Sequence, residues 1–438
     1  MNGGMRHGAG MLVCLAMVAW AVSEGRAATE GELQSAVFRA KPAVVMIGVE
    51  VGGTASVRCG PGEAQTVRPA PLTWIGSGSI IHPDGWVVTN GHVVKPFYEK
   101  NEATLGVQVL EQAVWQACRP ALEALAGDAR AQRIRALAAD PENRKGLTLE
   151  KKLLVTLSNG EMFPAAVKTY SPPAFVEVGT TKDASGAVRK EFGKDVAILK
   201  IEAKELPVVR LARHSTDLHL GQVLFVIGFP GVVAEHELLS KATRFEPSVT
   251  VGRVSGFKQD IGGQRVIQTD AAIIQGNSGG PVFDYRGNVI GAATFTSLQG
   301  DQVVQGFNFL IPVETIQDAA KKAGFVPEGK SAFTRLWNKG VDLYIEDKHY
   351  RAYSNMDAAS KIHPGFPDVE RVKEDCDIKH REQGYLHREE VQWGVMGFGL
   401  VAVVAGGWFG GRRANTAVRR RLRQLIREEM QQANASHR

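Results

Sequence analysis

Short stretches of alternating apolar and polar residues recur between residues 43 and 312, and they predict a mainly β protein. The predicted strands occupy residues 43–51, 76–94, 153–167, 196–201, 223–227, 250–256, 266–269, 282–294 and 303–312. Turn signals fold three of these stretches into hairpins, at Pro83-Asp84-Gly85, Asn159-Gly160 and Arg286-Gly287. Many short strands separated by turns are typical of an all-β barrel or sandwich, which a helix at residues 313–322 would close.

Residues 97–148 break this pattern, because alanine, leucine, glutamate and arginine recur there at helical spacing. Four apolar residues would line one helical face: Leu110, Val114, Ala117 and Leu122. We therefore expect a helical insertion within the β unit, which as a whole would span residues 28–325.

Residues 326–390 predict a second helical region, which is more polar. Seven positions fall at the spacings of one tetratricopeptide repeat: Leu336, Gly340, Leu343, Ala352, Met356, Ala359 and Pro364. A single repeat cannot bury its apolar face alone, so it would pack on the β unit, on another copy of the chain or on a partner. A helical hairpin stalk without repeat character is the open alternative.

The two ends of the chain predict export and membrane anchoring. Residues 1–27 are typical of a signal peptide, because the apolar run Met11–Val22 is too short to span a bilayer comfortably. Cleavage is expected near Ala27, with an uncleaved anchor as the open alternative. Residues 391–411 carry no charged side chain and are long enough for a transmembrane helix. The arginine-rich residues 412–438 then predict a cytoplasmic tail and an extracytoplasmic β unit.

The formal net charge of +6 belongs to that tail. Residues 412–438 hold eight arginines and two glutamates, and eight minus two equals the charge of the whole chain. The remaining residues are therefore close to neutral, whereas a nucleic-acid-binding domain spreads positive charge over a folded face. This distribution argues against nucleic acid as a partner.

Three cysteines remain once residues 1–27 are removed, namely Cys59, Cys118 and Cys376. An oxidising compartment favours one disulfide, and Cys59 with Cys118 is the preferred pair, although the spacing leaves other pairings open. Cys376 lies near His380 and His387, but their spacing matches no strong zinc pattern. We expect no metal site and no other cofactor.

Three separate segments carry the residue types that nucleophilic catalysis by serine requires. Ser278 lies in a glycine-rich stretch, which permits a tight turn that exposes the hydroxyl. His92 follows a β-rich run and is expected at the end of a strand, where it could act as a base. Asp195 opens an apolar strand and could orient the imidazole. Each residue alone is weak evidence, but their order along an all-β chain strengthens the interpretation.

These segments resemble the HtrA/Deg family of trypsin-like serine proteases in three stretches, residues 76–94, 195–201 and 269–289. The resemblance covers residues 43–324 apart from the helical insertion, and it implies a trypsin-like double β-barrel. It also implies that His92 is the general base, that Asp195 orients it and that Ser278 is the nucleophile. The oxyanion hole would be the amides of Gly276 and Ser278, with Asn277 shaping the turn between them. Trimers are a further implication.

Four departures from the family pattern stand out. Gly91 replaces the alanine usual before the histidine, which should be a mild change. Gln275 stands where proline is common, so the activation behaviour of that loop would differ. Asn308 occupies a position where glycine is frequent, which would narrow the specificity pocket. We also expect no PDZ domain after the β unit.

The specificity pocket is expected to be apolar. In trypsin-like folds an acidic residue six positions before the nucleophile selects lysine or arginine, and this chain has Ala272 there. The other predicted pocket residues are Ile274, Phe307, Asn308 and Leu310. They predict cleavage after small or medium aliphatic residues.

Together these features predict a membrane-anchored, extracytoplasmic serine endopeptidase that acts on unfolded or regulatory proteins. The alternative is a catalytically silent scaffold with a protease fold, which would bind partners through its helical repeat. All three catalytic positions hold the required residue types, and this argues against the scaffold.

Overall fold

The computed structural model describes residues 30–381, with gaps at 100–101, 183–187, 235–238, 241–243 and 300–301, together with residues 424 and 427. The predicted signal peptide at 1–27 and transmembrane helix at 391–411 lie outside the described residues. Within the described part of the chain, no helix has the length and apolar character needed to cross a membrane. The chain divides into two units, Met1–Glu374 and Asp375–Arg438, and in the second unit residues 375–381 are helical.

Six antiparallel strands close into a first barrel, because β5 pairs with both β6 and β1. In order around the barrel they are β1 (Val44–Val57), β3 (Leu72–His82), β4 (Trp86–Thr89), β9 (Val196–Ile201), β6 (Met162–Ser171) and β5 (Leu147–Thr156). The short β2 (Gln65–Val67) extends the sheet beside β1. Along β1, fully buried residues alternate with half-buried ones, as the two-residue period of a strand requires.

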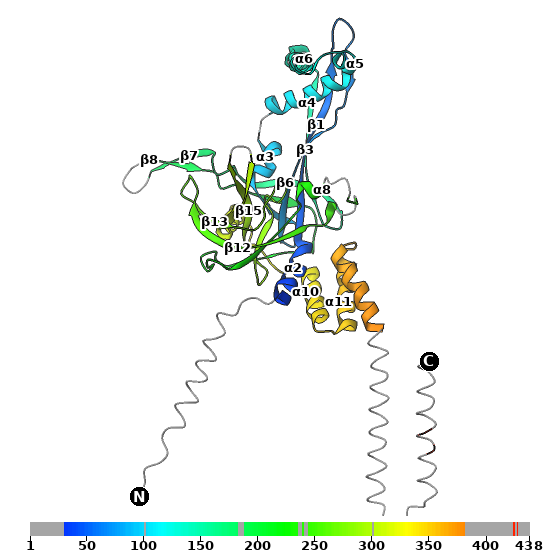
Figure 1. Cartoon of the computed structure of the whole chain (residues 1–438), viewed down its shortest axis with the longest axis vertical. Helices are drawn as coiled ribbons and strands as arrows, with labels where there is room; N and C mark the ends of the chain where they lie inside the picture. The colour runs from blue at the N-terminus through cyan, green and yellow to red at the C-terminus, as the bar shows by residue number, and fades with distance from the viewer. Residues whose placement is uncertain are drawn as a thin grey trace, which may run out of the picture. The chain divides into compact units, whose positions relative to one another are not determined.

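A second barrel closes in the same way through the pairing of β15 with β16. Its strands are β15 (Asn288–Gln299), β14 (Pro281–Asp284), β11 (Val223–Gly228), β12 (Ser248–Gln259), β13 (Arg265–Thr269) and β16 (Gln302–Pro312). The two-residue β10 (Arg210–Leu211) runs parallel to β15 at its edge. The two barrels confirm the predicted double β-barrel (Figure 1).

One apolar core spans the junction of the barrels. Val44 and Ile198 from the first barrel share it with Phe225 and Phe283 from the second, whose rings stack at 4.9 Å. The helix α9 (Val313–Lys322), predicted from the sequence, contributes to this core, and so does α2 (Glu30–Ala40), which was not predicted. The 3-10 turn η2 (Lys41–Ala43) leads from α2 into β1. Mutual burial of these side chains holds the barrels together.

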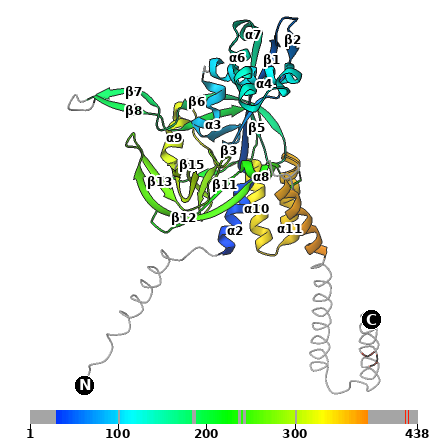
Figure 2. The same cartoon turned by 45° about the horizontal axis from the view of Figure 1, so that its top comes forward.

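The residues predicted as a helical insertion lie between β4 and β5 and form α4 (Glu102–Ala117), α5 (Arg119–Glu123), α6 (Gly127–Ala139) and α7 (Pro141–Lys145). They pack on the far end of the long strand β1, where Ala55 and Val57 join Leu110 and Leu122 in a separate apolar cluster (Figure 2). The Cys59–Cys118 disulfide, the preferred pair, ties this end of β1 to α4, and Cys376 is a free thiol.

A strand ribbon and a short helix in the connections between barrel strands were not predicted from the sequence. The strands β7 (Glu177–Lys182) and β8 (Val188–Phe192) form a two-stranded ribbon that projects away from the barrels (Figures 1 and 2). Their polar sequence lacks the apolar alternation that marks a half-buried strand, because the ribbon has no core face. The one-turn helix α8 (Gly231–Ala234) follows β11.

After α9 the chain forms the hairpin of α10 (Ala332–Ile345) and α11 (His349–Ile362), followed by helical residues 367–374. The two helices meet closely at Gly340, where an added Cβ atom would lie 2.6 Å from Cε of Met356. The hairpin packs on α2 beside the barrels, since Nε1 of Trp337 donates to the carbonyl of Phe38 in α2 at 2.9 Å. The apolar face of the hairpin is therefore packed at least in part against another element of the same chain.

Candidate active site

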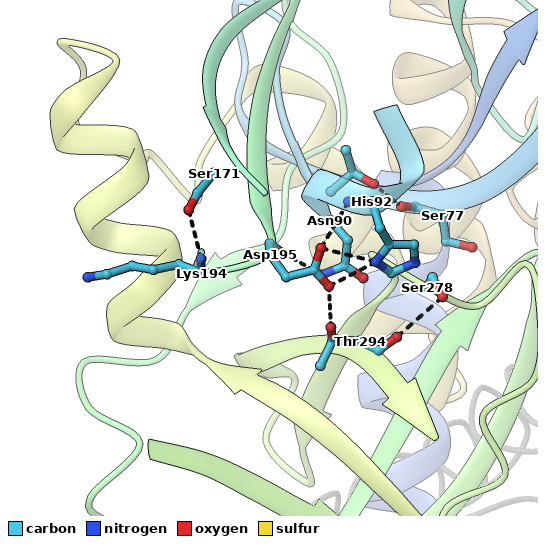
Figure 3. Close-up of polar contacts among 9 residues, drawn as sticks. Ser77, Asn90, His92, Ser171, Lys194, Asp195, Ser278 and Thr294 are labelled. Carbon is cyan, nitrogen blue, oxygen red and sulfur yellow. Dashed lines mark hydrogen bonds and ion pairs between the residues drawn. The ribbon is translucent and has the colours of Figure 1, made fainter. Parts of the chain in front are cut away.

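His92 and Asp195 face each other at the junction of the barrels (Figure 3). The imidazole Nδ1 lies 2.8 Å from Oδ2 of Asp195 and 3.1 Å from Oδ1, and the backbone amide of His92 donates to Oδ1 at 2.9 Å. His92 is the second residue of α3 (Gly91–Tyr98), so its predicted place at the end of a strand was wrong. The strand β4 ends at Thr89, and the first helical turn directs the imidazole at the carboxylate.

The chain around Asp195 is held in an unusual conformation. Asp195 directly precedes β9 and has a φ of 50°, in the left-handed region that aspartate and asparagine tolerate better than most residues. The amides of Lys194 and Asp195 donate to Oγ of Ser171 and to the carbonyl of Pro172, and Nδ2 of Asn90 donates to the carbonyl of Asp195 at 2.9 Å. These bonds fix the direction of the carboxylate.

The Asp195 carboxylate is only 4% exposed, yet it remains ionised. Burial alone would raise the pKa of Asp195, but hydrogen bonds from His92 and from the hydroxyl of Thr294 outweigh this effect and lower it. Thr294 lies on β15 of the second barrel, so the carboxylate is bonded from both barrels. The sequence analysis missed Thr294, because a threonine within an apolar strand carries no distinguishing signal.

Ser278 lies on the turn that connects β13 to β14 and lines the same cavity as His92. Gly276 has a φ of 98°, and an added Cβ atom would lie 2.4 Å from the carbonyl oxygen of Phe229, so only glycine is accommodated. Among the described backbone hydrogen bonds, the amides of Gly276 and Ser278 donate to no carbonyl. Two neighbouring uncommitted amides are the donors that an oxyanion hole requires.

Ser77 on β3 fastens this turn to the first barrel. Its amide donates to the carbonyl of Ser278 at 2.8 Å, and its hydroxyl donates to the carbonyl of Gly276 at 2.6 Å. The same hydroxyl accepts from the amide of Phe229 on the second barrel. Ser77 was not selected from the sequence, since its role depends on contacts between segments about 200 residues apart.

The Ser278 hydroxyl donates to the carbonyl of Thr294 at 3.5 Å, and it makes no hydrogen bond to His92 among the described residues. Figure 3 shows the serine on the opposite side of the imidazole from Asp195. His92, Asp195 and Ser278 therefore line one cavity, with the serine side chain turned toward β15.

A cavity of about 1000 Å³ adjoins these residues. Of the five predicted pocket residues, only Ile274 lines it. Along β16 the side chains alternate, so Asn308 and Leu310 point into the barrel and are fully buried, whereas Phe309 lines the cavity. Phe307 is 52% exposed to solvent, and Ala272 is also exposed.

The observed wall of the cavity is largely apolar beside the turn that carries Ser278. Its apolar residues are Val266, Ile273, Ile274, Phe309, Pro173, Ala174, Phe175 and Ile261. Lys95, Lys258 and Asp260 are the charged residues that line it besides His92 and Asp195. Ile274 thus lies where the prediction requires, and β16 contributes Phe309 to the cavity wall instead of the predicted Leu310.

Two closed antiparallel barrels with a histidine, an aspartate and a serine at their junction are typical of trypsin-like serine peptidases. Residues 76–291 match the family model described as trypsin-like peptidase domain.

The chain is 41% identical to Protease Do-like 5, chloroplastic, of Arabidopsis thaliana over 28% of its own length and 36% of the relative's. It is 36% identical to a probable periplasmic serine endoprotease DegP-like of Pseudomonas savastanoi pv. phaseolicola, over 61% of this chain and 39% of that protein. The chain thus matches little more than a third of the length of these curated relatives. Both relatives have names that describe proteases.

The solved structure described as HtrA-type protease AlgW with decapeptide shares 22% sequence identity, and the match covers 66% of this chain and 67% of that chain with a TM-score of 0.38.

Replacement of Gly91 by alanine should destabilise the fold, whereas the sequence suggested that an exchange of these two residues would have a mild effect. An added Cβ atom would lie 2.0 Å from the carbonyl oxygen of Ser171, which is backbone and cannot move alone. Overpacking of this kind costs about 1–3 kcal/mol in the free energy of unfolding, measurable by chemical denaturation. The matched control is Gly48→Ala on β1, where no atom lies within 4 Å of the new Cβ, and equal losses in both variants would contradict the argument.

Ionisation of Asp195 should stabilise the fold at neutral pH. Because its pKa is lowered on folding, this contribution is present above the unfolded value and is lost as the pH falls through the folded value. The difference in free energy of unfolding between wild type and Asp195→Asn should be constant above about pH 5 and shrink below about pH 4. Urea denaturation at a series of pH values measures it, and a difference that grows on acidification would contradict the lowered pKa.

Proposed function

We propose that this chain is a membrane-anchored serine endopeptidase with an extracytoplasmic catalytic domain, which hydrolyses peptide bonds in unfolded or regulatory proteins. The observation that carries the proposal is the His92–Asp195 pair at the barrel junction. Its carboxylate is buried, whereas its imidazole borders the cavity that Ser278 also lines. An imidazole held by one nitrogen offers the other to a reacting hydroxyl.

In the proposed reaction, Nε2 of His92 takes the proton of the Ser278 hydroxyl while Oγ attacks the scissile carbonyl carbon. Asp195 keeps the other proton on Nδ1 and stabilises the imidazolium. His92 then protonates the leaving amine, and later it activates the water that hydrolyses the acyl-enzyme. The amides of Gly276 and Ser278 would bind the developing oxyanion, with Asn277 between them.

Ser278 must change rotamer before it can attack. Its hydroxyl is directed at the carbonyl of Thr294, and at 3.5 Å this is a long hydrogen bond. The net cost of losing such a bond is about 1 kcal/mol or less. A substrate that enters the cavity could therefore induce the rotation, and a resting position of this kind is compatible with an active enzyme.

The apolar wall formed by Ile273, Ile274 and Phe309 supports a preference for small or medium aliphatic side chains on the residue before the scissile bond. Lys95, Lys258 and Asp260 also line the cavity, so charges of both signs border this apolar wall.

Membrane anchoring is supported by the sequence of residues 391–411 and its arginine-rich flank, and export by the signal-like residues 1–27. The similarity to relatives described as periplasmic supports the same sidedness. We also propose that α10 and α11 form a tetratricopeptide-like unit that binds a partner or joins protomers. The HtrA/Deg resemblance further implies that the chain forms trimers.

Ser278→Ala should abolish hydrolysis of casein by the purified full-length chain, with a loss of at least about 10⁴-fold. It should also abolish covalent labelling by a fluorophosphonate, which reacts with activated serines. The matched control is Ser255→Ala, the same substitution at an exposed serine of β12, which should leave both readouts unchanged. A wild-type chain that neither cleaves casein nor takes the label would favour the silent scaffold.

A peptide library should show preferred cleavage after valine, alanine, isoleucine or leucine. The expected preference over lysine and arginine is on the order of tenfold or more, because burying an unpaired cation in an apolar wall is costly. Cleavage sites read by mass spectrometry provide the measurement. A dominant lysine or arginine before the scissile bond would refute this specificity.

A further inference from the structure

A second cavity, of about 480 Å³, lies in the wall of the second barrel, far from the turn that carries Ser278. It is enclosed by α2, by β10, by the turn between β14 and β15, and by the start of α10. Both views show α2 and α10 side by side next to the barrels (Figures 1 and 2). The cavity therefore sits where the helical hairpin docks on the peptidase-like domain.

Basic side chains dominate its lining, and there are six of them: Arg39, Arg210, Arg286, Lys330, Arg335 and Lys339. Asp342 is the one carboxylate among the lining residues, and it is paired with Arg39. Five positive charges in this cavity are therefore not balanced by a lining carboxylate. Residues 1–411 carry no net formal charge, so outside this cavity they hold five more negative than positive charges, and the positive charge is concentrated here.

Most of these cations have no anionic partner within the described part of the chain. No ion pair involves Arg210, Lys330, Arg335 or Lys339 there, and Nε of Arg39 is buried without a hydrogen-bond acceptor. Arg286 donates to the hydroxyl of Tyr285, which is a neutral partner. Arg39 is half-buried and the other five cations are exposed, so water and salt screen part of their mutual repulsion, and a bound anion would relieve the remainder.

The backbone brings two of these cations together. Gly329 precedes α10, and an added Cβ atom there would lie 3.0 Å from Cα of Arg210. Glycine fits here without displacement, whereas a side chain would require β10 or the segment entering α10 to shift by a few tenths of an ångström. As a result, Lys330 and Arg335 from the start of the hairpin share the cavity with Arg210 from the barrel edge.

We propose that this cavity binds a phosphate group that carries at least two negative charges, as in a phosphomonoester or a pyrophosphate. Four of the six cations are arginines, whose planar guanidinium forks match phosphate oxygens in pairs. The volume is within the range of small-molecule sites. A single carboxylate would neutralise one of the five charges, whereas a multiply charged phosphate neutralises more.

Such a ligand would bridge the barrel and the hairpin. Arg39 and Arg210 belong to the barrel side, and Arg335 and Lys339 belong to α10. Binding would thus stabilise the docked hairpin by mass action, with a rise in melting temperature that depends on ligand concentration. The proposal is independent of peptide hydrolysis, because none of these residues lines the cavity beside Ser278.

Calorimetric titration of the full-length chain in a non-ionic detergent tests the proposal with pyrophosphate as the probe. Arg210→Gln and Arg335→Gln should each weaken pyrophosphate binding about tenfold, the loss expected for one charge-assisted hydrogen bond. The matched control is Arg135→Gln, which removes the same charge from the exposed face of α6 and should leave binding unchanged. Thermal melting of each unliganded variant verifies that it is folded.

Two further probes define the ligand. Acetate should not compete with pyrophosphate, and phosphatidic acid added to the same micelles distinguishes a lipid source from a soluble one. Displacement of pyrophosphate by phosphatidic acid would assign the site to a lipid headgroup, and failure to displace it would assign a soluble phosphate compound. The proposal is overturned if pyrophosphate does not saturate the wild type, if acetate competes equally, or if Arg135→Gln weakens binding as much as the cavity variants.

Discussion

The burial of one ionised carboxylate is the constraint on which this structure depends. Asp195 is almost inaccessible to water, so its charge must be satisfied by donors fixed in place. The first barrel supplies the amide and imidazole of His92, and the second supplies the hydroxyl of Thr294. Neither barrel alone can satisfy the carboxylate. The hydrogen bonds that orient Asp195 in the site consequently also require the two barrels to be docked.

The turn that carries Ser278 also depends on contacts from both barrels. Its residues belong to the second barrel, but Ser77 of the first barrel binds both of its outward carbonyls. Those carbonyls accept hydrogen bonds from Ser77, whereas the amides of Gly276 and Ser278 donate to no described carbonyl. We propose that these two amides bind the oxyanion. Preorganisation of this kind is effective because no rearrangement is needed when charge develops.

The additions to the barrels attach away from this junction. The helical insertion packs on the far end of β1, where the Cys59–Cys118 disulfide joins it. The α10–α11 hairpin packs against α2, next to the basic cavity. Each has its own apolar contacts, so it can vary without disturbing the buried carboxylate.

The sequence by itself predicted most of the barrel strands and the helical insertion, because period-two burial and turn residues are local properties. It also favoured the Cys59–Cys118 pair and selected His92, Asp195 and Ser278 as candidates, whose catalytic roles stay predictions. It could not show that His92 begins a helix or that Phe309, rather than Leu310, faces the cavity, since a shift of one residue reverses the face of a strand. Thr294, Ser77 and the basic cavity were decided by tertiary structure alone. Each depends on contacts between segments far apart in the chain, and no local pattern records such contacts.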